Sequence, residues 1–122
     1  MSVGTVATIE RYGFGRVRVS GREYTRDIVV APEGVVEERW WRREGHLLQV
    51  EDIAKYVEEL RPSALIVGTG YFGVMRVDKS VEDYLRSRGI ELIALKTGDA
   101  VKEFNERVKR GERVLAALHL TC

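Results

Sequence analysis

The stretch Ala64-Leu65-Ile66-Val67-Gly68-Thr69-Gly70-Tyr71-Phe72-Gly73 decides the fold of this chain. It opens with an unbroken apolar run, which is typical of a buried strand. The run stops at a glycine-rich turn, and a turn of this kind brings the backbone close to a ligand beyond the carboxyl end of a strand. The stretch therefore predicts a buried strand that ends at a candidate binding site.

Helices and strands alternate on both sides of this stretch. The predicted elements are a helix over 50–60, the strand from residue 64, a helix around 81–85, a strand over 91–95, a helix from residue 97 and a strand over 114–118. Pro62 ends the first helix, and Thr97 is predicted to be the N-cap of the third. Phe104 lies on the apolar stripe of that third helix. Short right-handed connections between these elements favour a largely parallel sheet.

The first 49 residues have the period of strands instead. Val17 and Val19 alternate with arginines, and a turn at Gly21 predicts an antiparallel hairpin that continues into an apolar strand over 28–31. Glycines at 13 and 15 indicate a bulge or a close approach of the backbone. A further strand is predicted over 35–42, which would send Trp40 and Trp41 to opposite faces.

Length and composition set the class of protein. With 122 residues, the chain is predicted to be one α/β domain over 1–122, mainly β in 1–49 and αβαβαβ in 50–122. Hydrophobic residues are 44% and charged residues 32% of the chain, and no apolar run reaches the length of about 20 residues that crosses a bilayer. A net charge of +1 gives no general attraction for nucleic acid. We expect neither membrane insertion nor nucleic-acid binding.

The cellular compartment is predicted from cysteine usage and from the first residues. One cysteine cannot form an internal disulfide, and residues 1–4 lack the basic start of a secretory signal. These features favour the cytoplasm. A high charge content with a single asparagine and a single glutamine also hints at a thermophilic source.

One crevice is predicted at the carboxyl ends of the strands. The candidate ligand residues are Gly68, Thr69, Gly70, Lys96, Thr97 and His119. They meet if the three strands are parallel, whereas an antiparallel last strand would remove His119 from the set. Backbone N–H groups of the turn and the charge of Lys96 predict weak binding of a sulfate, phosphate or carboxylate.

Other chemistry is predicted to be absent. The turn fits G-x-G-x-x-G, but no acidic residue follows the second strand to bind a ribose, and the chain is too short for a dinucleotide fold. A phosphate loop would need the missing Gly-Lys-Ser/Thr. His119 with Cys122 is a weak nucleophile pair, because no carboxylate or amide is evident that would orient the histidine. His46 and His119 with one cysteine lack the paired spacing of a zinc site, so no metal and no cofactor are expected.

A candidate interface surrounds two adjacent indoles. Trp40, Trp41 and Arg42 belong to the residue types that are enriched at the centres of protein interfaces. Adjacent strand positions do not easily bury both rings in one core. Contact with a partner or a second copy is therefore expected here, although glutamates nearby also suit a solvated strand edge with cation–π contacts.

Several segments together resemble the adipogenesis-associated Mth domain family. The resemblance covers nearly the whole chain and is carried by 24–30, 41–46, 68–73, 96–101, 104–105 and the closing Ala117-Leu118-His119-Leu120-Thr121-Cys122. It implies a three-layer fold, in which a central mixed sheet has helices on one side and a small antiparallel sheet on the other. It also implies relatives that include a mitochondrial assembly factor for respiratory complex I and an adipogenesis-associated cytosolic protein, and it brings no established catalytic residues.

Two functions remain open from the sequence. The favoured one is a non-enzymatic protein-binding or assembly domain, because no complete set of acid, base and nucleophile is evident. The alternative is a small enzyme or metabolite-binding protein that uses Thr69, Lys96, Thr97 and His119 around an anionic group.

Overall fold

The structure is a computed structural model that describes residues 6–122. The expectation drawn from residues 1–4 therefore lies outside the described residues. The helices are α1 (Val50–Leu60), α2 (Lys79–Arg86) and α3 (Thr97–Lys109). The strands are β1 (Ile9–Gly13), β2 (Arg16–Val19), β3 (Arg22–Tyr24), β4 (Ile28–Ala31), β5 (Gly34–Glu37), β6 (Leu47–Leu48), β7 (Ala64–Thr69), β8 (Arg76–Val77), β9 (Glu91–Leu95) and β10 (Val114–His119).

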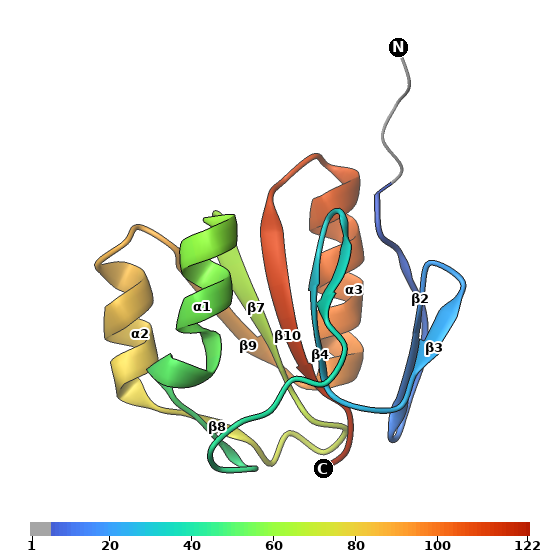
Figure 1. Cartoon of the computed structure of the whole chain (residues 1–122), viewed down its shortest axis with the longest axis horizontal. Coiled ribbons are helices and arrows are strands. Elements are labelled where there is room, and N and C mark those ends of the chain that lie inside the picture. Colours follow the sequence, from blue (N-terminus) through green and yellow to red (C-terminus); the bar gives the residue numbers. More distant parts are fainter. Residues whose placement is uncertain (1–5) are drawn as a thin grey trace.

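A five-stranded mixed sheet forms the centre of the molecule, in the order β5-β4-β10-β7-β9 (Figure 1). Strand β7 pairs in parallel with both β10 and β9, whereas β4 runs antiparallel to β10 and β5 antiparallel to β4. The predicted α/β class and the central mixed sheet are therefore confirmed, with parallel pairing around β7 and antiparallel pairing at β4. The last strand is parallel to β7, so His119 lies at the same edge of the sheet as Thr69.

The two faces of this sheet are covered differently. One face packs against α1 and α2, and the other packs against α3 together with the antiparallel sheet β1-β2-β3. The expectation that helices lie on one side only is thus wrong in its placement of α3. The chain moves outward from β7 to β9 and then back across β7 to β10, and right-handed connections in opposite directions put α2 and α3 on opposite faces.

Strand β7 shows why its apolar run is unbroken. Leu65 and Val67 pack toward α1 and α2, whereas Ala64 and Ile66 pack toward α3. Successive side chains of a strand point to opposite faces, so a strand covered on both faces needs apolar residues at every position. Phe104 on α3 is fully buried and packs in the same hydrophobic cluster as Ala64 and Ile66.

The N-terminal half departs from its prediction in three places. The hairpin at Gly21 is formed by β2 and β3, but 28–31 leaves that small sheet and joins the central one as β4. Gly15 occupies the turn between β1 and β2 with φ of 78°, and its N–H donates to the carbonyl oxygen of Leu120 at 2.9 Å. A Cβ at Gly15 would make only an ordinary contact, 3.9 Å from Thr121 Cγ2, so the glycine is required by the positive φ of the turn and not by a close approach of the backbone. The strand expected over 35–42 ends at Glu37.

Candidate functional site

The glycine-rich turn after β7 is packed against the end of β10. Gly70 has φ of 111°, and a Cβ at this position would collide with the backbone of Cys122. The N–H of Tyr71 donates to the carbonyl oxygen of Thr121 at 2.6 Å, and that of Val74 donates to the carbonyl oxygen of Cys122 at 3.0 Å. The turn is therefore packed against residues 121 and 122.

Thr97 joins three segments of the predicted crevice. Its hydroxyl accepts from the N–H of Gly70 at 2.8 Å and donates to the carbonyl oxygen of His119 at 2.6 Å. The predicted N-cap role is wrong, because Lys96 is the N-cap and Thr97 is the first, fully buried residue of α3. Its hydroxyl instead links the end of β9 to the ends of β7 and β10.

The predicted crevice residues are thus adjacent, but they bond mainly to each other. The Thr69 hydroxyl donates to the carbonyl oxygen of Leu95 at 3.0 Å, and a Cβ on Gly68 would meet the Thr97 hydroxyl. The N–H groups of Gly70, Tyr71 and Gly73 all have internal acceptors. Lys96 is exposed beside Gly73 and is the group left for an anion, so anion binding stays a prediction that rests on this side chain.

We expect Gly70→Ala to lower the free energy of unfolding by about 1 to 3 kcal/mol, the usual cost of a strained backbone conformation. The added methyl group would face the Cys122 backbone in a conformation that L-residues avoid. Gly98→Ala is the control, because a Cβ there meets nothing within 4 Å, and it should be neutral or slightly stabilising. Equal effects of the two substitutions in urea unfolding would contradict the packing described for the turn.

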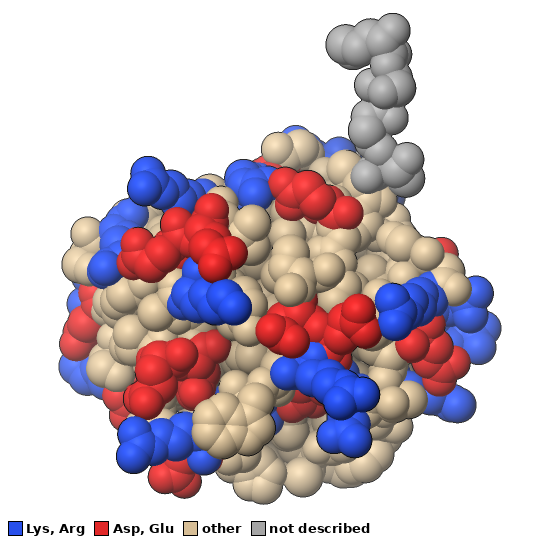
Figure 2. Space-filling model, viewed as in Figure 1, with Lys and Arg blue, Asp and Glu red and all other residues tan. Residues whose placement is uncertain are grey.

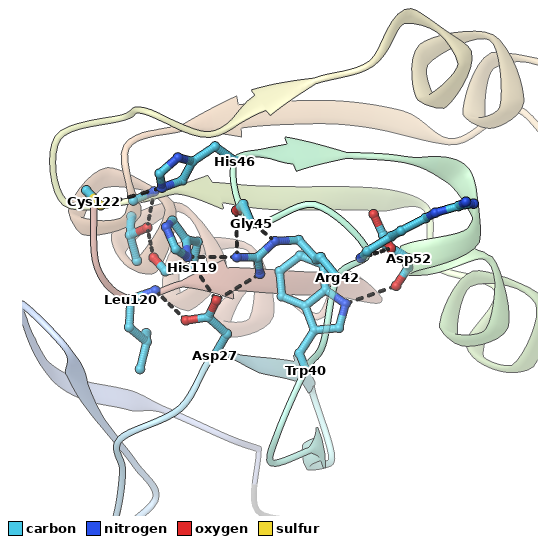
Figure 3. Close-up of polar contacts among 12 residues, drawn as sticks. Asp27, Trp40, Arg42, Gly45, His46, Asp52, His119, Leu120 and Cys122 are labelled. Carbon is cyan, nitrogen blue, oxygen red and sulfur yellow. Dashed lines mark hydrogen bonds and ion pairs between the residues drawn. The ribbon is translucent and has the colours of Figure 1, made fainter.

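A largely buried network of charges lies beside this turn (Figure 3). The Arg42 Nη1 donates to Asp27 Oδ2 at 2.8 Å, and its Nε and Nη2 donate to the carbonyl oxygen of Gly45 at 3.3 and 2.9 Å. His119 Nδ1 lies 2.8 Å from the same Asp27 oxygen, and the N–H of Leu120 donates to Asp27 Oδ1 at 2.8 Å. The carboxylate therefore joins the segment before β4, the loop at Arg42 and the end of β10.

These contacts assign the tautomer of His119. Asp27 can only accept a hydrogen bond when it is ionised, so the ring nitrogen 2.8 Å away must carry a proton. Arg42 Nη2 has two N–H groups; one donates to Gly45, and the nitrogen also lies 3.0 Å from His119 Nδ1. The proton is nevertheless assigned to Nδ1, because two acceptors only 2.8 Å apart would repel each other. In neutral His119, the lone pair is then on Nε2.

Asp27 is held in its ionised form. Burial alone would raise the pKa of this carboxyl group, but hydrogen bonds from His119, the Leu120 amide and Arg42 outweigh the burial. The pKa of Asp27 is therefore lowered below its ordinary value. The carboxylate that would orient His119, which was not evident from the sequence, is thus present.

His46 and Cys122 lie next to this network. Cys122 Sγ is 3.5 Å from His46 Nε2, and the two imidazole rings pack edge to face with centroids 5.9 Å apart. His119 is only 5% exposed, whereas His46 is exposed and Cys122 half-buried. His46 is far from His119 and Cys122 in the sequence, so the sequence alone could not predict that the fold brings them into contact.

The two tryptophans have opposite environments. The Trp40 indole is buried, donates from Nε1 to the carbonyl oxygen of Asp52 at 2.9 Å and stacks under the Arg42 guanidinium. Trp41 is 77% exposed. Of the predicted interface residues, Trp40 and Arg42 are therefore internal, and contact through Trp41 stays a prediction.

A separate group of aromatic rings is exposed at the glycine-rich turn. We call Phe14, Tyr71 and Phe72 the aromatic surface; their side chains are 53%, 48% and 63% exposed. The ring centroids are 5.9 Å apart for Phe14–Tyr71, 6.2 Å for Phe14–Phe72 and 5.1 Å for Tyr71–Phe72. The sequence placed Tyr71 and Phe72 in a turn but gave no sign that Phe14, from the β1–β2 turn, would meet them.

Charges on the rest of the molecule are mixed. On the face seen in Figure 2, basic and acidic side chains lie next to one another. Exposed pairs such as Arg88–Glu58 and Arg22–Glu38 account for part of this pattern. Such exposed pairs contribute little to stability.

Within residues 6–122, no helix has the length and apolar character needed to span a bilayer.

Comparisons with known proteins agree with this architecture. A structure described as MT938 is 32% identical, covers 95% of this chain and 99% of its own, and has a TM-score of 0.77. A conserved hypothetical protein, PH1505 from Pyrococcus horikoshii OT3, is 30% identical with 94% and 99% coverage and a TM-score of 0.78. A Bordetella pertussis protein described as a Mth938-like domain is 22% identical with 98% and 89% coverage and a TM-score of 0.70, which shows the fold alone.

The family assignment follows from these likenesses and from one family model. The expected resemblance to Mth domains is confirmed by the MT938 and Mth938-like structures. The model described as protein of unknown function (DUF498/DUF598) matches residues 9–119, which include the central sheet, the buried charge network and His46. The chain belongs to the DUF498/DUF598 family of small Mth938-like α/β domains.

Proposed function

We propose that this chain is a protein-binding domain rather than an enzyme, and that its partner binds the aromatic surface formed by Phe14, Tyr71 and Phe72. The observation that carries the proposal is the exposure of these three mutually packed rings. Exposed apolar side chains gathered in one place mark binding sites in soluble domains, whereas scattered ones do not. A cytoplasmic location is part of the proposal, because a single cysteine offers no internal disulfide for an oxidising compartment.

The aromatic surface is held in a defined shape. Tyr71 is fixed through its backbone to Thr121, and Phe14 precedes Gly15, whose N–H is bonded to Leu120. Both turns are thus anchored to the same short segment after β10. A preorganised surface loses less conformational entropy on binding than a loose one, which favours specific contact.

The charges next to the aromatic surface indicate the chemistry of the partner. Arg76 is exposed three residues after Gly73, and Lys96 lies against Gly73. Neither side chain forms an ion pair with another described residue in 6–122. A partner segment with apolar side chains flanked by Asp or Glu would pair with both, because complementary charges steer association. The resemblance to a family that includes an assembly factor favours the same class of function.

The alternative, a small-anion or metabolite site around Thr69, Lys96, Thr97 and His119, has less support. Its oxygens and backbone N–H groups are used inside the protein, as described above for Thr69, Gly70 and Thr97. Lys96 is the shared element of both proposals. In the favoured one, it pairs with a partner carboxylate.

Selection from a random peptide display library tests the proposal with a defined probe. Peptides that combine aromatic or aliphatic residues with Asp or Glu are expected to be enriched on the native protein. The double variant Phe14→Ser/Phe72→Ser should weaken their binding at least about tenfold, because the few residues that dominate an interface each cost about 2 kcal/mol or more when truncated. Lys96→Glu should weaken binding of the same peptides, with a smaller effect that fades at high salt.

Two further variants locate the binding surface. Val36→Ser removes an exposed apolar side chain from β5 and should leave binding unchanged. Trp41→Ala should also leave it unchanged. Loss of binding in Trp41→Ala with retention in the double variant would overturn the aromatic surface and favour the interface predicted from the sequence. Enrichment of basic peptides, or equal binding by the native protein and the double variant, would also refute the proposal.

A further inference from the structure

The chain has two histidines and one cysteine, and the fold brings all three together. His46 comes from the loop before β6, His119 is the last residue of β10, and Cys122 follows three residues later. Their ligand atoms all lie within 4.8 Å of one another. Figure 3 shows His46 and His119 side by side, with Cys122 next to His46. Sequence spacing could not predict this cluster, because His46 and Cys122 are 76 residues apart.

His119 has a ring nitrogen whose lone pair is unused. Its Nε2 is buried and has no hydrogen-bond partner among the described residues. Asp27 holds the proton on Nδ1, so Nε2 is the acceptor nitrogen. A buried polar atom without a partner costs free energy and calls for a physical explanation. A metal ion that accepts the lone pair of Nε2 would be such an explanation.

The surroundings of His119 are those of a metal-binding histidine. Histidines that bind metals usually donate their other ring N–H to a carboxylate or carbonyl group, which fixes the tautomer and the ring orientation. Asp27 provides this contact at 2.8 Å. Arg42 balances the charge of Asp27, so the carboxylate is not itself a free cation ligand.

The distance between Cys122 and His46 suits a tetrahedral ion. With Zn–S about 2.3 Å and Zn–N about 2.0–2.1 Å, tetrahedral geometry separates the sulfur and nitrogen ligands by about 3.6 Å. Cys122 Sγ and His46 Nε2 are 3.5 Å apart. The ligand atoms of the set lie within 4.8 Å of one another, so metal binding requires the exposed His46 ring to move closer to His119. The N–H of Val74 donates to the carbonyl oxygen of Cys122 at 3.0 Å, which holds the backbone of this residue beside the turn.

We infer that His46, His119 and Cys122 form a binding site for a late first-row divalent cation, with Zn²⁺ as the reference ion. Thiolate and imidazole ligands select zinc and its neighbours over Mg²⁺ and Ca²⁺, which need oxygen ligands. When the metal–sulfur bond forms, the Cys122 thiol releases its proton to solvent, and both histidines bind as neutral imidazoles. Three protein ligands leave the fourth position to water or to an exogenous ligand.

Titration of the reduced full chain with Zn²⁺ and with Co²⁺ tests the site. One equivalent of metal is expected, with proton release that increases calorimetric heat in buffers of high ionisation enthalpy. The Co²⁺ form should show a thiolate-to-cobalt charge-transfer band and the intense visible bands of tetrahedral coordination. His46→Ala and Cys122→Ser should each weaken Zn²⁺ binding by more than about tenfold, because even the loss of a group that only orients a metal ligand costs about that much.

Glu44→Ala is the matched control, because Glu44 is exposed on the same loop as His46 and contributes no ligand atom to the cluster. It should bind Zn²⁺ like the native protein. Equal affinity in the native protein, His46→Ala and Cys122→Ser would refute the site, as would an octahedral Co²⁺ spectrum without the charge-transfer band. The result is independent of peptide binding, because no member of the aromatic surface is a metal ligand.

Discussion

Phe104→Ala is expected to lower the free energy of unfolding by about 3 to 5 kcal/mol, the range found when a buried phenylalanine is truncated. Phe104 is a residue of α3 and is fully buried in the cluster that α3 forms with the central sheet and the small sheet β1-β2-β3. Its removal would leave a cavity where three layers meet, and such packed layers relax only in part. Denaturant unfolding monitored by circular dichroism measures the loss.

The chain offers a matched control for this change. Phe72 is also a phenylalanine, but it is exposed on the aromatic surface, and Phe72→Ala should change the stability by no more than about 0.5 kcal/mol. A loss below about 1 kcal/mol for Phe104→Ala would mean that the stripe of α3 does not pack as described. It would also place α3 in a different register on the sheet.

Arg42→Met is expected to cost about 3 to 5 kcal/mol at neutral pH, because removing one partner of a buried ion pair leaves the other charge uncompensated. Asp27 would keep its bonds to His119 and Leu120 but lose the cation that lies 2.8 Å away. Methionine keeps part of the packing over Trp40, so the loss reports mainly the charge. Unfolding in urea, with a chelator present, measures it.

The pH dependence of this loss has a definite sign. The pKa of Asp27 is lower in the folded protein than its ordinary value of about 3.9. The stabilisation from ionised Asp27 is therefore complete above that value and is lost as the pH falls through the folded pKa. Arg42→Met should cost less at about pH 3 than at about pH 7. Arg39→Met, at an exposed arginine nearby, should have little effect at either pH, and an equal cost of both substitutions would contradict the network.

The fold could be predicted from local patterns because those patterns reflect burial. The run that begins at Ala64 has apolar residues on both faces, and the structure buries β7 on both faces. The period over 50–60 and the proline at 62 gave α1 its bounds. The layer of α3 could not be predicted, because it depends on the direction in which the chain crosses β7, and no residue of α3 encodes that direction.

The candidate site was predicted only in part, for a related reason. Thr69, Thr97 and His119 follow three strands, so the parallel sheet was enough to bring them together. Asp27 and Arg42 were harder to foresee, because each comes from an irregular segment beside the sheet. A carboxylate just before an apolar strand is the one signal that could have identified Asp27. Contacts between loops depend on the whole fold and have no periodic signature.

The position of β10 in the central sheet has a consequence for how the chain acquires its structure. Strand β10 lies between β4 and β7, which belong to different halves of the sequence. Before residues 114–119 are in place, a β4–β5 hairpin and a β7–β9 pair would each expose an unpaired edge. Insertion of β10 joins these two units and closes long loops, so this late, long-range step should limit the folding rate. Until it occurs, the unpaired edges should make partly folded chains prone to aggregate.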